Sequence, residues 1–447
     1  MEFLDKLVLP QSAEHIELLH YMTVLVLSLF IPFISIIFGG AFLSIKYRKK
    51  ANKTGNDFYA KLSRDIIEYV TVNNSVGVIL GIVPIVTLIL IFSQLLHTAQ
   101  INTTILLLIS LLMIIAALVM IYTYRHSSIV NFVFNSLENV SLKNPDAQSE
   151  LDRIKNTSFN LSIKYGKSGL VFLFVGIWFF VAGYTSAVKF SVWNLSSVFT
   201  SLANPTVLLN LIIFICFAFM LTSSAVLFVH LYWKEDRKNE NPEYTRFLKS
   251  VISKVGLKLG IPLPLLITLS IFTIPNINLS GSIFFYGVLA ILLIFLAYHQ
   301  FFMIELKNEY KFSSLVFFIL ILASISLIIK DQKAMSNSTE LHSLALSTEY
   351  DKMLAELKGE GIEAVINGKE LYDIRCSSCH RFDQKLVGPA HLDVLPKYAG
   401  KEAQLVAFIR NPVKVDPAYP PMPNLGLKPQ EAEAVAKYLL EELEKRK

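Results

Sequence analysis

The feature that most constrains this sequence is a series of long apolar stretches separated by polar segments. Eight of them cover approximately residues 20–45, 76–96, 103–124, 169–190, 206–233, 257–275, 282–305 and 312–330. A helix rises about 1.5 Å per residue, so about 20 apolar residues cross the roughly 30 Å of hydrocarbon in a bilayer. Each stretch reaches or approaches that length. The sequence therefore predicts an all-α, polytopic membrane bundle of about eight transmembrane helices.

The composition agrees with a membrane protein. Hydrophobic residues make up 53% of the chain and charged residues only 17%, which excludes a disordered protein and disfavours a purely soluble one. The formal net charge is +6, but basic loops serve to orient membrane helices, so this excess does not indicate nucleic acid. We expect the lipid bilayer among the partners, and no nucleic acid.

The placement of the basic residues predicts the topology. Lysine and arginine concentrate after the first, third, fifth and seventh stretches, whereas the other loops hold none apart from Lys189 at a border. Basic loops of membrane proteins face the cytoplasm. The N-terminus and everything after Lys330 are then expected on the opposite side. The first apolar run is too long for a cleavable signal peptide, and its start is not basic.

The character of the chain changes at Lys330, which predicts three parts. Residues 1–330 are expected to form the transmembrane domain, and Pro262 and Pro264 predict a kink in its sixth span. Residues 331–350 are rich in Ser, Asn and Thr and are expected to form a linker. Residues 351–447 are expected to form a small separate domain.

The small domain contains Cys-Ser-Ser-Cys-His at 376–380. Two thiols separated by two residues can add to the vinyl groups of a haem, and the adjacent histidine can then bind its iron. The alternatives are a redox dithiol, a zinc half-site or a chance match. A dithiol site needs a βαβ context, and zinc needs a second Cys/His pair that His391 alone does not supply. We therefore expect one covalent haem c, bound by Cys376, Cys379 and His380.

A sixth iron ligand is expected downstream, in Tyr-Pro-Pro-Met-Pro at 419–423. The prolines stiffen the loop that carries Met422, which lowers the entropy lost on holding the side chain in place. The alternative is a methionine that only packs. Histidine–methionine ligation raises the reduction potential of a haem, as suits an electron carrier.

These motifs resemble class I cytochrome c. Gly-Lys-Glu-Leu-Tyr at 368–372 corresponds to the family's first helix, Leu-Val-Gly-Pro at 386–389 follows the haem motif, and residues 431–444 correspond to its closing helix. The resemblance implies a small all-α cytochrome c domain in which the Pro389 carbonyl supports the His380 ring. It leaves His391 as a surface histidine rather than a ligand. Haem of this kind is attached outside the cytoplasm in bacteria, so we expect the bacterial inner membrane, with the cytochrome domain and the N-terminus on the periplasmic side.

Eight spans imply a task beyond anchoring a cytochrome, and histidines are the candidate ligands for a further cofactor. No acidic or basic residue lies deep within a span, which gives a proton-pumping role little support. Haem b needs imidazole ligands from facing helices. His20, His230 and His299 are the candidates, and the alternative is an interfacial histidine without a ligand role. The candidate pairs are His20 with His97 or His15, and His230 with His299. For His97 and His126, an interfacial position without a ligand role is favoured.

A second set of residues lies in the first two spans. It consists of His20, Thr54-Gly55, Arg64 and Asn-Asn-Ser-Val-Gly-Val-Ile-Leu-Gly-Ile at 73–82. This set is similar to the start of subunit I of the cytochrome bd quinol oxidases, and the similarity implies that His20 binds a haem and that the subunit contacts quinol. The chain departs from that family in carrying Ile85 where a glutamate is expected, and in lacking a Gly-Arg-Gln quinol-loop signature and a ninth helix.

Three functions follow from these patterns. The first is a c-type cytochrome subunit of a respiratory complex, which transfers electrons from quinol through haem b and haem c to a periplasmic acceptor or carrier. The second is a bd-type terminal oxidase subunit with an added haem c. The third is a haem-free membrane scaffold that docks a cytochrome c domain on a larger complex. The first needs other membrane respiratory subunits as partners, and the sequence leaves open whether the chain is itself an enzyme.

Overall fold

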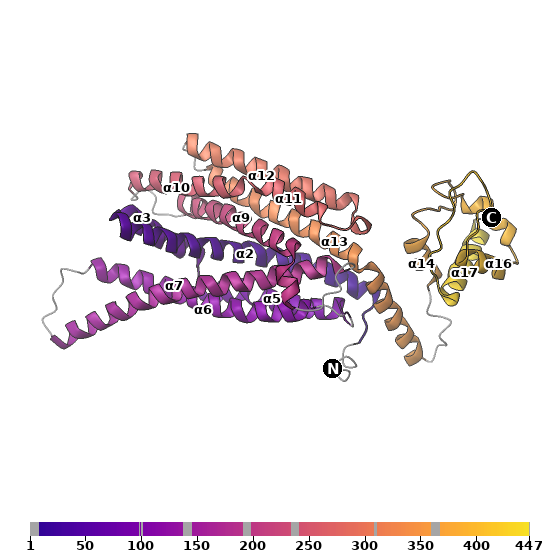
Figure 1. Ribbon diagram of the computed structural model, residues 1–447, viewed down its shortest axis with the longest axis horizontal. Coiled ribbons are helices and arrows are strands. Elements are labelled where there is room, and N and C mark those ends of the chain that lie inside the picture. The colour runs from indigo at the N-terminus through magenta and orange to yellow at the C-terminus, as the bar shows by residue number, and fades with distance from the viewer. Residues whose placement is uncertain are drawn as a thin grey trace. The chain divides into compact units, whose positions relative to one another are not determined.

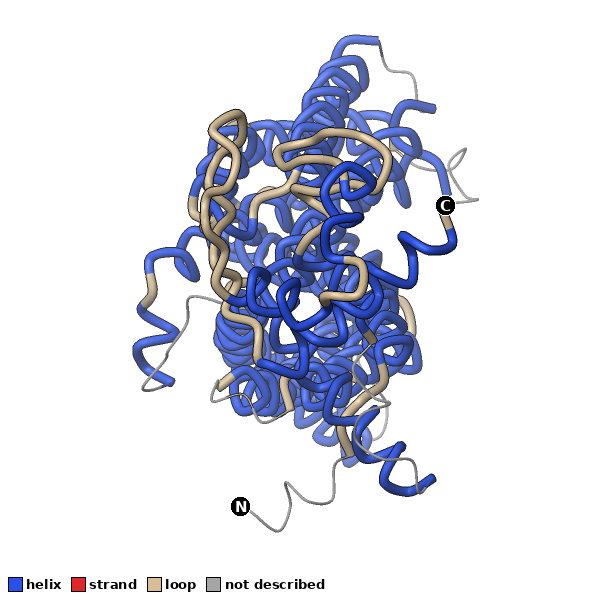
Figure 2. The backbone as a smooth tube through the Cα atoms, turned by 90° about the vertical axis from the view of Figure 1, so that its right-hand side faces the viewer, coloured by secondary structure: helices blue, strands red, loops and turns tan. Residues whose placement is uncertain are grey.

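The chain folds into two compact all-helical units, Met1–Leu344 and Ala345–Lys447. The computed structural model describes residues 9–97, 99, 102–136, 145–190, 198–233, 241–307, 311–358 and 367–446. Every regular element in these ranges is a helix, as Figure 2 shows. The all-α prediction is therefore confirmed for the described part of the chain.

The first unit is the predicted membrane bundle. Its described residues form eight helical segments that are long and apolar enough to cross a membrane. Its α-helices are α2 (Ala13–Thr54), α3 (Asp57–Val70), α4 (Asn74–Gly81), α5 (Val83–Leu95), α6 (Thr103–Ser136), α7 (Pro145–Val188), α8 (Val198–Ala203), α9 (Pro205–Phe228), α10 (Pro242–Gly260), α11 (Leu263–Phe272), α12 (Gly281–Lys307) and α13 (Lys311–Lys358). A π-helical turn η2 (Val229–Trp233) extends α9, and a 3₁₀ turn η4 (Asn276–Asn278) precedes α12.

The helices of the bundle lie roughly side by side. In Figure 1, α6 and α7 run along one side, α10 to α12 run along the other, and α2 and α9 lie between them. Hydrogen bonds join α6 to α7 along their length: Ser110 Oγ donates to the Gly176 carbonyl at 2.8 Å, and Asn131 Nδ2 donates to Ser162 Oγ at 3.1 Å. Such polar contacts between helices suit a bilayer, where water cannot satisfy the same groups.

Two of the spans are each made of two helices. In the sixth, α10 ends at Gly260 and α11 starts at Leu263, which confirms the break predicted from the prolines. In the second, α4 ends at Gly81 and α5 starts at Val83 with Pro84 in its first turn. A proline has no N–H to donate, and its ring clashes with the preceding turn of a helix. A helix therefore readily begins at a proline, but a proline inside a helix kinks or breaks it. The second break was not expected.

The expected linker, residues 331–350, is helical and continues α13 to Lys358. This segment contains no glycine or proline, and Ser, Asn and Thr lower helix propensity by only a few tenths of a kcal/mol each. Met335, Thr339 and Leu346 also bury their side chains. Side-chain packing therefore keeps the segment helical where composition suggested irregular chain.

The second unit is the predicted small domain. It consists of α14 (Gly368–Arg375), α15 (His391–Val394), the 3₁₀ turn η6 (Leu395–Tyr398), α16 (Glu402–Arg410) and α17 (Pro429–Lys445). The two terminal helices, α14 and α17, cross at Gly368. A Cβ at this position would lie 1.9 Å from the carbonyl oxygen of Ala434, so only glycine permits the close approach. Tyr372 and Tyr438 pack beside the crossing with ring centroids 5.5 Å apart.

Candidate haem site

The Cys-Ser-Ser-Cys-His motif forms a tight turn at the end of α14. Asn367 caps the start of this helix by accepting hydrogen bonds from the backbone of Lys369 and Glu370. At the other end, the Cys379 and His380 N–H groups donate to the Cys376 carbonyl at 3.0 and 2.9 Å. Both cysteines are free thiols; Cys376 is buried and Cys379 is half-buried. The turn thus brings the two thiols and the histidine together in one short segment.

The His380 ring is held in a single orientation. Its Nδ1 donates to the Pro389 carbonyl oxygen at 3.2 Å, the support that the family resemblance implied. Because Nδ1 carries the proton, Nε2 keeps its lone pair for a metal. Gly388 leaves the space for the ring, since a Cβ there would lie 2.2 Å from His380 Cε1. Tyr372 Oη donates to the His380 carbonyl at 3.0 Å, and burial raises the pKa of this phenol so that it stays protonated.

A mostly apolar cavity of about 280 Å³ opens beside this histidine. Cys376, His380 and Met422 all line it, so the structure brings the expected ligand Met422 into the same space as the haem motif. The apolar lining comes mainly from Leu395, Leu405, Phe408, Ile409, Val413, Val435 and Leu439. Lys397, Lys414 and Asp416 add polar groups. Paired thiols, an oriented imidazole, a thioether and apolar walls are the set of groups that a covalent haem requires.

His391 is not a surface histidine, so that prediction was wrong. Its side chain is only 7% exposed and stacks on His380 with ring centroids 5.0 Å apart. Neither ring nitrogen has a hydrogen-bond partner. Burial, followed by the neighbouring His380, lowers the pKa of His391 to about 4. The ring is therefore neutral at physiological pH and forms part of the cavity wall.

The candidate haem b ligands lie in very different surroundings. His20 on α2 has a buried Nδ1 without a hydrogen-bond partner. The buried His230 of η2 is held on both ring nitrogens, by Tyr69 Oη at 3.0 Å and by Thr245 Oγ1 at 3.5 Å. His299 is exposed on α12. Of the three, His20 thus keeps the most suitable free nitrogen for a ligand.

Two further histidines have partners at the outer end of the bundle, as the topology defines it. His15 Nε2 lies 2.8 Å from Gln94 Oε1, which connects α2 to the end of α5. His97, shortly after α5, neighbours His342 of α13. His126 is exposed on α6. The ligation of haem b by any of these histidines stays a prediction.

Sequence reasoning missed a mostly apolar cavity of about 100 Å³, with a few polar groups in its wall, near the same end of the bundle. Its polar lining includes Tyr184, Asn210, Lys330 and Asp331, and its apolar lining includes Phe180. Lys330 Nζ and Asp331 Oδ1 form an ion pair of 2.9 Å. The available signal is this charged pair directly after the eighth apolar stretch, at the boundary of the predicted span.

The fold and the haem cavity define a membrane-anchored c-type cytochrome, a multi-pass membrane protein with a soluble electron-transfer domain. The sequence profile of the family "Cytochrome c" matches residues 365–442. Cytochrome c-551 of Pseudomonas denitrificans is 38% identical over 78 residues, which are 16% of this chain and 94% of that protein. Cytochrome c-551 of Azotobacter vinelandii is 36% identical over 77 residues, 16% of this chain and 94% of that protein. The chain therefore belongs to the cytochrome c family through its C-terminal domain.

This membership implies a covalent haem c on the non-cytoplasmic side of the membrane. The family profile begins at residue 365 and so bears on the second unit alone. It gives no support to the N-terminal resemblance to the cytochrome bd oxidases, which stays a prediction.

Proposed function

We propose that this chain is a membrane-bound electron-transfer subunit that carries electrons from quinol, through haem b, to haem c and on to a periplasmic acceptor. The observation that carries the proposal is the cavity lined by Cys376, His380 and Met422 on a chain with eight candidate spans. A single span would suffice to anchor a cytochrome. A bundle of eight can in addition bind a donor that is soluble in the membrane, and quinol is such a donor.

The cavity lined by Lys330 and Asp331 supports a quinol site, because its mostly apolar wall suits a quinol ring and its few polar groups suit the hydroxyls. Asp331 offers a carboxylate as proton acceptor, and its Lys330 partner also reaches Ser270 Oγ at 3.4 Å. The Tyr184 hydroxyl is buried without a hydrogen-bond partner. A buried polar group without a partner requires an explanation, and a bound quinol hydroxyl supplies one. The Tyr184 ring stacks on Phe180, which lines the same cavity.

The proposed reaction accounts for both protons and both electrons of a quinol. A quinol becomes a quinone and releases two electrons and two protons. Asp331 accepts the first proton, and the second passes to water on the outer side. The haem c that Cys376, Cys379 and His380 would hold can store one electron, so the second electron would need another centre, for which a haem b held by His20 is proposed. The periplasmic acceptor and the other respiratory subunits of the complex reoxidise haem c.

The test is reduction of haem c by quinol under anaerobic conditions, using the purified full-length chain. We expect a short-chain quinol to reduce haem c, and Asp331→Asn to slow this reduction on the order of a hundredfold, as the loss of a proton acceptor does. Asp152→Asn, which alters an exposed carboxylate on α7, is the matched control. Dithionite should reduce haem c equally in all three proteins. The proposal fails if quinol reduces none of them, or if both variants behave like the parent.

A haem-free scaffold is the second candidate, because both nitrogens of His230 already have partners and His299 is exposed. A pyridine haemochrome assay separates the two candidates. Haem b in addition to haem c, lost in His20→Ala, supports the electron-transfer subunit. Haem c alone supports the scaffold.

A further inference from the structure

A groove of about 640 Å³ lies between α4 and α6 of the bundle. It exists because α4 stops at Gly81, before Pro84, so that this short helix is separate from α5. The groove opens on the outer surface of the bundle, where Val78 and Val119 are 50% and 64% exposed. In a membrane, such a surface faces lipid.

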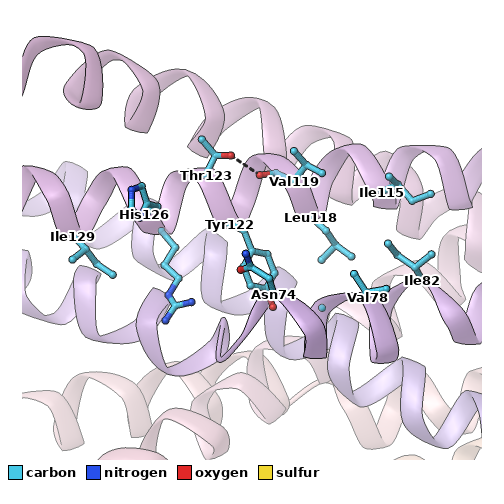
Figure 3. A pocket seen from close by; sticks show the side chains of 12 residues that line it. Asn74, Val78, Ile82, Ile115, Leu118, Val119, Tyr122, Thr123, His126 and Ile129 are labelled. Atoms are coloured by element: carbon cyan, nitrogen blue, oxygen red, sulfur yellow. Dashed lines mark hydrogen bonds between the residues drawn. The ribbon is translucent and has the colours of Figure 1, made fainter. Parts of the chain in front are cut away.

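Most polar side chains of the groove gather in one part of it, with Ile129 beyond them, and the part on the other side is apolar. Figure 3 shows His126, Tyr122 and Asn74 towards one part, and Ile82 and Ile115 towards the other. The polar part lies near the cytoplasmic end of the bundle, because Asn74 begins the second span and His126 follows the third. The apolar part extends towards the middle of the membrane. An amphiphile of the cytoplasmic leaflet has the same order of head group and chain.

The charge of the groove identifies the head group. Arg125 lines it, and its Nε is buried without a hydrogen-bond partner. None of the 12 lining residues is acidic. Tyr122 Oη already donates to the Asn73 carbonyl at 3.0 Å, and Thr123 Oγ1 to the Val119 carbonyl at 2.7 Å. The Arg125 Nε therefore lacks an acceptor in the described part of the chain, and the phosphodiester of a lipid head group is an anionic acceptor at this depth of the bilayer.

From this geometry we propose that the groove binds an anionic glycerophospholipid of the cytoplasmic leaflet. Its phosphate pairs with Arg125, and one acyl chain lies over Val78, Leu118 and Val119. A quinol has an uncharged head and would leave Arg125 without a counter-charge, so the groove favours the lipid. The proposal does not depend on quinol oxidation, because it concerns other residues at the opposite end of the bundle.

The test is native mass spectrometry of the full-length chain titrated with phosphatidylglycerol or with phosphatidylcholine of the same acyl chains. We expect phosphatidylglycerol to bind at least about tenfold more tightly, as one charge-assisted contact implies. Arg125→Gln should abolish this difference between the lipids. Arg153→Gln, which alters an exposed arginine paired with Glu150 on α7, should leave it intact.

A second variant keeps the proposal falsifiable if Arg125→Gln does not fold. Val119→Trp adds bulk at an exposed position of the groove, and it should weaken the binding of both lipids. Equal binding of the two lipids by the parent chain would overturn the proposal. The proposal would also be overturned if the Val119→Trp variant lost bound quinone while its binding of phosphatidylglycerol stayed unchanged.

Discussion

At the scale of single residues, the haem site depends on how tightly His380 is held. The Pro389 carbonyl accepts a hydrogen bond from His380 Nδ1, and Tyr372 donates one to the His380 carbonyl. The His380 ring has space because Gly388 has no side chain. These contacts select the tautomer with a free Nε2 before any iron binds. A ligand that is oriented in advance loses little entropy when it coordinates a metal.

Gly388→Ala tests this orientation. The added Cβ would lie 2.2 Å from His380 Cε1, so the ring must move or the loop must open. We expect a loss of about 2 kcal/mol in the stability of the haem domain, as overpacking of this kind usually costs, together with a lower haem content per chain. Haem absorbance recorded at increasing denaturant concentration measures the stability of the domain, and the absorbance without denaturant measures the haem content per chain. Gly281→Ala is the control, because a Cβ there meets no atom within 4 Å; equal effects of the two substitutions would contradict the argument.

Met422→Ala tests the sixth ligand. Axial ligands set haem potentials over a range of roughly 0.8 V, so loss of a thioether should lower the potential on the order of 0.1 V. The covalent haem should remain, because Cys376 and Cys379 are unchanged. Redox titration of the full chain measures the potential, and Met353→Ala, on α13 and outside the cavity lining, is the control. If Met422 only packs, the two variants will have the same potential.

At the scale of elements, the helix α3 organises the end of the bundle that is predicted to face the cytoplasm. α3 packs on α2 and contacts α10, and Tyr244 Oη of α10 donates to the buried Asp65 Oδ2 of α3 at 2.7 Å. Tyr69 of α3 bonds His230. The position of His230 is therefore determined by helix docking, which explains its burial without a cofactor.

Asp65→Ala should loosen this docking. The substitution leaves the buried Tyr244 hydroxyl without its charged acceptor, which costs about 2 kcal/mol for a hydrogen bond of this type. We expect a lower unfolding temperature and faster proteolysis within residues 57–70. Glu68→Ala changes an exposed acid on the same helix and should have little effect. Identical proteolysis of the two variants would show that the hydrogen bond does not hold α3 in place.

The sequence predicted those features that depend on local pattern. Apolar length located the eight spans, and spacing located the haem motif with Met422. Features that depend on packing were not visible in the sequence. The helical continuation of α13 is accompanied by contacts from other segments, such as the hydrogen bond from Asn337 Nδ2 to the Asn278 carbonyl, and the burial of His391 by ring contacts with Tyr372 and His380. The cavity at Asp331 forms where several helices meet, so the charged pair after the eighth apolar stretch marks its position but does not show that a cavity exists.

At the scale of the whole molecule, the proposed electron transfer from quinol to a periplasmic acceptor requires the tail to face the periplasm. The loops rich in lysine and arginine predict this orientation, because cytoplasmic loops are the basic ones. Protease added to intact spheroplasts should therefore remove the haem-staining tail, 367–446, and leave an epitope tag inserted at exposed Gly55 uncut. Lysis should expose that tag. A tail protected in spheroplasts and cut only after lysis would reverse the topology. It would also place the Asp331 cavity on the cytoplasmic side, where quinol oxidation would release its protons inwards.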